Sequence, residues 1–191
     1  MESQYHPISN FKNFILNGVI AKLFIATIFL TIISTTFIFA QGGLQVYGRI
    51  RINKGNTDNT QMIIIKDGSR VGSQQPGRGG KFDIKLEYDA DYILSFEKQD
   101  YVTKKISINT SVSSDFARNT QNIIDFEVEL EPQTDLIAIK IYDNPVAKIR
   151  YDARSGNFDY DTNYSASFQK QIREEEKRLA EDIKKKEIEQ E

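Results

Sequence analysis

Residues 79–108 alternate between apolar and polar side chains, and this pattern strongly limits the folds open to the chain. Three such runs follow one another, at 82–86, 92–97 and 102–108, and an acidic turn at 87–91 separates the first two. Period-two alternation is typical of strands with one face in a core and the other in water. Strands joined by tight turns pair antiparallel. We therefore expect a meander whose apolar face is covered by a second sheet.

The flanking sequence continues this pattern on both sides. Alternation at 44–52 and 124–130 predicts a first and a last strand, and the apolar run 62–65 predicts another. Asp67-Gly68 is typical of a two-residue hairpin. About seven short strands at this spacing predict an all-β fold, an antiparallel β-sandwich over residues 41–133.

Four motifs stand in order between residues 44 and 131. They are Val46-Tyr47-Gly48-Arg49-Ile50, Gly80-Lys81-Phe82-Asp83-Ile84, Tyr92-Ile93-Leu94-Ser95-Phe96 and Lys98-Gln99-Asp100-Tyr101-Val102. In this order and spacing they resemble the carboxypeptidase regulatory-like domain, as it occurs in envelope proteins of the Bacteroidetes type. The resemblance implies a transthyretin-like (prealbumin-like) β-sandwich.

Three positions in these motifs carry specific expectations. Gly48 falls on the inward face of its strand, where a close crossing suits it. The family usually has Gly where this chain has Asp100, so we expect a different turn geometry there. Tyr101 belongs to the family pattern, which implies a structural tyrosine bridging sheet and loop.

Residues 1–40 have the pattern of an export signal. Lys12 and Lys22 precede an apolar run that ends at Ala40. This predicts a signal peptide cleaved after Ala40 or, because residues 19–40 are about long enough to span a bilayer, an uncleaved membrane anchor. Both alternatives place the chain from Gly42 onward outside the cytoplasm, in the periplasm or cell envelope, with the second adding an inner-membrane anchor.

The residue pattern of the C-terminal third of the chain changes twice, at residue 134 and at residue 165. Residues 134–164 form an extension that we expect to pack on the sandwich or on a partner, with one further strand at 136–142 and a short one at 146–151. Residues 165–191 predict a charged helix. Its narrow apolar stripe consists of Phe168, Ile172, Leu179 and Ile183. The stripe fits either a solvated single helix or a partner-docking or self-associating helix, so these four are the candidate partner-binding residues.

Composition excludes most catalytic chemistry. The chain contains no cysteine, and its only histidine is His6 in the predicted signal, so thiolate sites, histidine-ligated zinc and Ser-His-Asp catalysis are excluded. A net charge of −2 gives no bias toward nucleic acid. Asp159 to Asn163 resembles the start of a calcium loop, but Tyr164 and Lys170 stand where Gly and Glu are required. Residues 77–81 lack the first glycine and the hydroxyl residue of a phosphate loop. We expect no catalytic residue, cofactor or metal.

The resulting hypothesis is a non-enzymatic exported envelope protein. It would act as an accessory or protein-interaction module whose partner is one or more envelope proteins. The alternative hypothesis is a carbohydrate- or ligand-binding module of the cell envelope, which would use surface tyrosines and the acids of the turn at 87–91. These residues are Tyr47, Tyr88 and Tyr101 with Glu87, Asp89 and Asp91.

Overall fold

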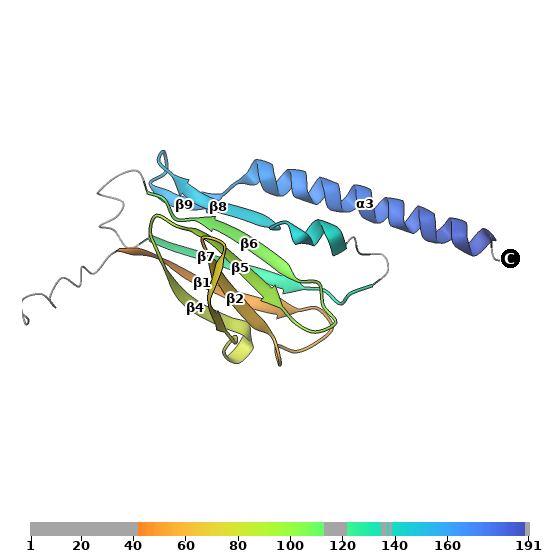
Figure 1. Ribbon diagram of the computed structural model, residues 1–191, viewed down its shortest axis with the longest axis horizontal. Helices are drawn as coiled ribbons and strands as arrows, with labels where there is room; N and C mark the ends of the chain where they lie inside the picture. The colour runs from red at the N-terminus through yellow and green to blue at the C-terminus, as the bar shows by residue number, and fades with distance from the viewer. Residues whose placement is uncertain (1–41, 113–121, 135–136, 138, 190–191) are drawn as a thin grey trace, which may run out of the picture. The chain divides into compact units, whose positions relative to one another are not determined.

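The computed structural model describes residues 42–112, 122–134, 137 and 139–189 (Figure 1). Within these residues the chain is mostly β-sheet, in two sheets, with one C-terminal helix, which confirms the predicted all-β sandwich and terminal helix. No helix among them is long and apolar enough to cross a membrane. The predicted signal or anchor at 1–40 lies outside the described residues, and so does most of the polar loop before residue 122.

In the described residues, nine strands make up the two sheets. The three-stranded sheet has the order β4-β1-β7 and consists of β4 (Lys81–Glu87), β1 (Gly43–Ile52) and β7 (Asn122–Leu130). The six-stranded sheet consists, in order, of β3 (Ser69–Gln74), β2 (Gln61–Lys66), β5 (Asp91–Glu97), β6 (Lys104–Asn109), β8 (Ala147–Asp152) and β9 (Asn157–Tyr160). The helical elements are the 3₁₀ turns η1 (Arg78–Gly80) and η2 (Ile139–Asp143) and the helix α3 (Thr162–Glu189).

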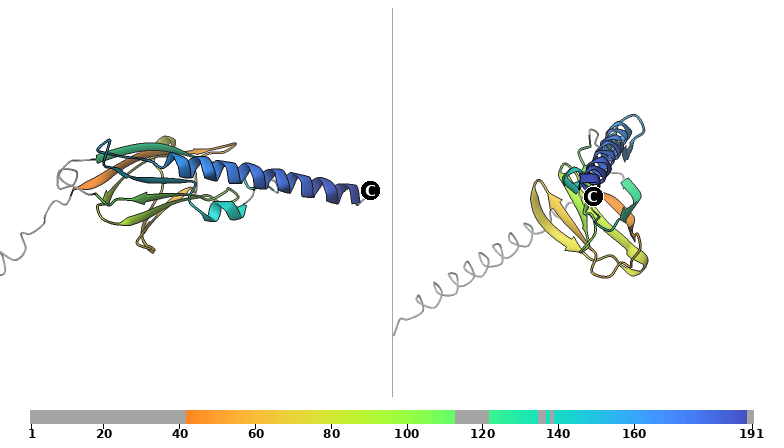
Figure 2. Two further views of the ribbon diagram at one scale, coloured as in Figure 1. Left: turned by 90° about the horizontal axis from the view of Figure 1, so that it is seen from above. Right: turned by 90° about the vertical axis from the view of Figure 1, so that its right-hand side faces the viewer.

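The main core lies between the facing sheets, which Figure 2 shows as two layers. Three phenylalanine rings meet there. Phe82 and Phe126 come from the three-stranded sheet and Phe96 from the six-stranded one, with ring centroids 5.6 Å apart for Phe82–Phe96 and 5.7 Å for Phe82–Phe126. The alternation of apolar and polar residues along the strands therefore gives each sheet one apolar face, and the two apolar faces pack against each other.

Glycines and left-handed residues shape the strand connections as the sequence predicted, with one exception. Asp67 and Gly68 both have positive φ, at 48° and 79°, which is the two-residue hairpin expected between β2 and β3. The expectation of a different turn geometry at Asp100 is wrong. Asp100 itself adopts φ 65°, the conformation that a glycine supplies, because aspartate enters this region more readily than most residues.

Two strand pairs correct the expectation of a purely antiparallel sandwich. β1 and β7 run parallel over nine residue pairs, from Leu44↔Asn122 to Ile52↔Leu130. β6 and β8 are also parallel. In both cases the partners are far apart in the chain, so the intervening elements supply the long crossover that a parallel pair needs. Alternation determines which face is buried and leaves strand direction open.

The extension at 134–164 becomes part of the six-stranded sheet. β8 and β9 continue the sheet beyond β6, and Ile149 and Phe158 from these strands join the main core. The strand expected at 136–142 is wrong where the structure describes it, because Ile139–Asp143 is the 3₁₀ turn η2. The edge of β6 that such a strand would need is already occupied by β8.

α3 begins at Thr162, three residues before the predicted start. The N–H of Tyr164 donates a hydrogen bond to Asp161 Oδ1 at 3.0 Å, which makes Asp161 the N-cap of the helix. The helix therefore starts directly after β9, and its first turns lie beside β8 (Figures 1 and 2).

Candidate binding surfaces

The apolar stripe of α3 divides into a buried half and a half that belongs to neither buried cluster of the described chain. Phe168 and Ile172 are 3% and 8% exposed and form a second core cluster with Val102 and Tyr142. The rings of Phe168 and Tyr142 meet edge to face, with centroids 6.0 Å apart. Phe168 and Ile172, two of the four candidate partner-binding residues, therefore pack the helix against the sandwich.

Tyr164 adds polar contacts to this attachment. Its hydroxyl donates to the carbonyl oxygen of Pro145 at 2.7 Å, and the ammonium of Lys148 lies 4.3 Å from its ring centroid. Burial raises the pKa of the Tyr164 phenol, so the hydroxyl stays protonated and can donate. The first turns of α3 are thus held by apolar, hydrogen-bonding and cation–π contacts together.

The later turns of α3 continue the stripe without such contacts. Leu179 and Ile183 are partly exposed and belong to neither buried cluster of the described residues. Figures 1 and 2 show this part of the helix running on past the strands. Its ion pairs are local to the helix, as in Lys177–Glu181 at 4.0 Å, and such exposed pairs contribute little stability.

A groove lies where the first turns of α3 approach β7. It has a volume of about 440 Å³, and its lining includes Val128, Tyr142 and Phe168 with the carboxylates of Glu131 and Glu176. Burial raises the pKa of Tyr142 to about 12, and the two carboxylates add to that rise. The Tyr142 hydroxyl in the groove therefore stays protonated at neutral pH.

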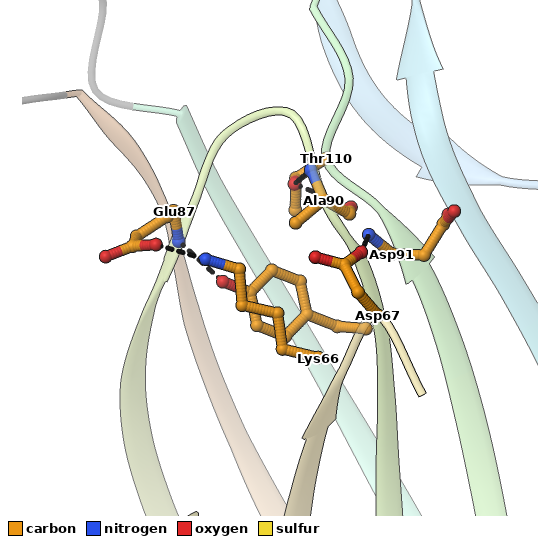
Figure 3. A network of polar contacts seen from close by, with 7 residues as sticks. Lys66, Asp67, Glu87, Ala90, Asp91 and Thr110 are labelled. Carbon is orange, nitrogen blue, oxygen red and sulfur yellow. Dashed lines mark hydrogen bonds and ion pairs between the residues drawn. The ribbon is translucent and has the colours of Figure 1, made fainter. Parts of the chain in front are cut away.

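The acidic turn serves the structure, as Figure 3 shows. The carboxylate of Glu87 forms an ion pair with the ammonium of Lys66, and this hydrogen bond raises the pKa of Lys66. The N–H of Glu87 donates to the hydroxyl of Tyr92 at 3.2 Å. These contacts join the ends of β2, β4 and β5.

The next residues of the turn are fixed in the same way (Figure 3). The N–H of Asp91 donates to Asp67 Oδ1 at 3.0 Å, while Asp91 Oδ1 accepts a 2.7 Å bond from the side-chain amide of Asn109. Thr110 Oγ1 accepts from the Ala90 N–H at 3.0 Å and donates to the Ala90 carbonyl at 2.9 Å. Glu87 and Asp91 are thus engaged in holding strand ends together.

Two of the three candidate tyrosines also have structural roles. Tyr88 stacks on Phe158 with ring centroids 6.4 Å apart, and its hydroxyl accepts a 2.7 Å bond from Asn122 Nδ2. The hydroxyl of Tyr101 donates to the carbonyl oxygen of Lys54 at 3.2 Å, so this tyrosine is structural as predicted, but it joins the segment before β6 to the turn after β1. Tyr47 differs, because it is 40% exposed on the outer face of the three-stranded sheet.

Tyr47 lies in a hollow of about 520 Å³, which we name the Tyr47 hollow. In strand register Tyr47 stands between Asp83 of β4 and Asp125 of β7. The other lining residues come from β1, the end of β3 and the loop after it, the start of β4, and β7. They are Gly48, Arg49, Gln74, Gln75, Gly77, Lys81, Phe82 and Glu127.

Sequence reasoning singled out Tyr47 and missed the hollow around it. Alternation predicts that Tyr47 and Asp83 point outward, but the second carboxylate comes from β7, whose parallel pairing with β1 has no local signal. Glu127 is held by Arg51 at 2.6 Å and Arg49 at 3.8 Å. The hydrogen bond from Arg51 lowers the pKa of Glu127, so this wall of the hollow stays charged and paired.

The two segments with superficial motif likeness have ordinary structural roles. The Gly77 N–H donates to the Lys81 carbonyl at 2.7 Å, and the Gly80 N–H donates to the Gly77 carbonyl at 3.0 Å, so these amides close a loop–strand junction. Asp161 caps α3. In the described part of the chain, no three His, Cys, Asp or Glu side chains gather in a group that could hold a metal ion.

No protein-family model matches the chain, and a search of curated proteins finds no match either.

Proposed function

We propose that this chain is a non-enzymatic exported envelope protein, an accessory module that binds a partner protein through the later turns of α3. The observation that carries the proposal is the division of the α3 stripe. Phe168 and Ile172 attach the helix to the sandwich, whereas Leu179 and Ile183 extend the same stripe without a buried cluster of their own.

The chemistry of the stripe indicates the kind of partner. Leu179 and Ile183 are four residues apart, and charged residues surround them on the rest of the helix. An apolar stripe this narrow suits side-by-side packing with one other helix rather than insertion into a core. We therefore propose that the occupant is an amphipathic helix of a second protein.

Export is supported by the sequence of residues 1–40, with lysines ahead of a long apolar run and Ala40 at its end. A transthyretin-like identity for the sandwich is supported by the positions of the four motifs. They fall on β1, β4 and β5 and on the turn that leads into β6, which are elements of the two facing sheets.

Site-specific photo-crosslinking in the producing cells tests the docking proposal. A photoreactive amino acid at position 179 or 183 should form a crosslink to one second protein, while the same group at Lys177 or Lys184, away from the stripe, should not. A matched Ile183→Glu variant should abolish the crosslink from position 179. Crosslinks between two copies of this chain, or none from the stripe, would contradict the proposal.

The export proposal has a separate test. The mass of the protein recovered from the envelope fraction should correspond either to a chain beginning at Gln41 or to the uncleaved chain retained in the inner membrane. Recovery of the protein in the cytoplasm would contradict export, whatever the outcome of the crosslinking.

A further inference from the structure

We propose that the Tyr47 hollow is a binding site for a neutral saccharide. The hollow lies on the outer face of the three-stranded sheet and shares no lining residue with α3. Ligand binding in the hollow is therefore independent of partner docking through the helix.

The placement of Tyr47 is the first reason. It occupies the central strand of its sheet, with Asp83 and Asp125 directly opposite it on the two neighbouring strands. Side chains opposite each other on adjacent strands lie about 5 Å apart, so a carboxylate flanks the ring on each side. A partly exposed phenol ring offers a flat apolar surface to the C–H face of a sugar, and the carboxylates accept hydrogen bonds from its hydroxyls.

The donors in the hollow complement these acceptors. Arg49 is two residues along β1 from Tyr47 and lies opposite Lys81 in the register with β4. Gln74 at the end of β3 and Gln75 in the loop after it line one wall, and each amide can both donate and accept. A sugar hydroxyl is also both donor and acceptor, so it matches this mixed lining better than a ligand with a single kind of group.

The charge of the hollow argues for a neutral ligand. Its lining contains the cations Arg49 and Lys81 and the acids Asp83, Asp125 and Glu127. Glu127 is already paired with Arg51 and Arg49, so neither sign dominates. A site for phosphate or another anion would need an excess of cationic donors. A lipid site would need a larger apolar wall than Tyr47 and Phe82 provide among the charged and amide side chains of the lining.

The hollow is also rigid enough to bind selectively. Three hydrogen-bonded strands form its floor, and the 2.7 Å bond from the Gly77 N–H to the Lys81 carbonyl holds the loop at its rim. Sites built on strands need little ordering when a ligand arrives. The volume of about 520 Å³ falls within the range of small-molecule sites, which suits a short oligosaccharide.

Isothermal titration calorimetry of the purified full-length chain with cellotetraose, maltotetraose and chitotetraose tests the proposal. At least one of these neutral probes should bind saturably. Tyr47→Ala should weaken that binding about tenfold or more, because the stacking surface is lost, whereas Tyr47→Phe should keep it within about twofold. Asp125→Asn should also weaken it, because one acceptor is replaced by an amide.

Two controls keep the outcome interpretable. Val71→Ala changes an exposed residue of the other sheet and should leave binding unchanged, and the thermal unfolding midpoint of each variant checks its fold. Ile183→Glu should likewise leave binding unchanged, which separates this site from the docking helix. Saturation by none of the three probes, binding that survives Tyr47→Ala, or binding of inorganic phosphate in their place would overturn the proposal.

Discussion

At the residue scale, Gly48 allows close packing in the core because it has no side chain. An added Cβ at this position would lie 2.6 Å from the Phe126 carbonyl oxygen and 2.8 Å from Phe82 Cε1. The Phe82 ring therefore packs against bare backbone, and this is the close crossing predicted from the inward position of the glycine.

We expect Gly48→Ala to lower the free energy of unfolding by about 1–3 kcal/mol, because the new methyl group overpacks a site bounded partly by backbone. Gly72→Ala is the matched control, since its added Cβ would meet only Ile64 Cδ1 at 3.9 Å. Urea unfolding of the two variants measures the difference. Equal unfolding midpoints would contradict the tight packing at Gly48.

Tyr142 makes stability depend on pH in the alkaline range. Its pKa is raised from 10.0 to about 12 by burial, then by Glu131 and Glu176. Below pH 10 the phenol is protonated in both the folded and unfolded chain, so its contribution is fully present. Between pH 10 and about 12 the unfolded chain releases a proton that the folded chain keeps, so stability falls as pH rises.

Urea unfolding of the wild type and of Tyr142→Phe, at about pH 9 and about pH 11, measures this contribution. We expect the wild type to lose more stability between the two pH values than the variant does. The other tyrosines are common to both proteins, so their titration cancels in the comparison. A parallel loss in the two proteins would show that Tyr142 titrates with an ordinary pKa.

At the element scale, alternation was sufficient to place strands and their buried faces. The runs at 44–52, 92–97 and 124–130 became β1, β5 and β7 with the expected residues inside. The same pattern does not predict which strands pair with each other. The pairing depends on the connections between strands and on which strand occupies each sheet edge. Competition for sheet edges left Ile139–Asp143 without one, and these residues form η2 instead.

The helix offers a direct contrast between its two halves. Phe168→Ala should lower the free energy of unfolding by about 3 kcal/mol, because the ring is buried against Tyr142. Leu179→Ala should change it by less than about 0.5 kcal/mol, since the side chain is partly exposed and alanine favours the helix. Urea denaturation followed by circular dichroism measures both. A large loss for Leu179→Ala would mean that the later turns already pack within the molecule.

At the scale of the whole molecule, β8 and β9 are part of the sandwich rather than an appendage to it. The predicted sandwich ended at residue 133, because alternation is clean up to β7 and weak beyond it. Ile149 and Phe158 nevertheless fill the main core at 1% and 6% exposure, and β8 covers the edge of β6. Isolated strands of four to six residues carry little periodic signal of their own.

This arrangement predicts the outcome of shortening the chain. A protein of residues 41–133 exposes the edge of β6 and loses Ile149 and Phe158 from the main core, at a cost of about 3–6 kcal/mol from their burial alone. It also loses Tyr142, Phe168 and Ile172 from the second core cluster. The total cost is a large part of the stability of a typical domain, so we expect this protein to aggregate or unfold at much lower urea. A protein of residues 41–160 keeps β8 and β9 and loses only Phe168 and Ile172 from the buried side chains of the described residues. It should stay monomeric and unfold at a urea concentration between those of residues 41–133 and the full chain. Size-exclusion chromatography and urea unfolding compare the two, and equal midpoints would show that β8 and β9 only lie against a sandwich that is already complete.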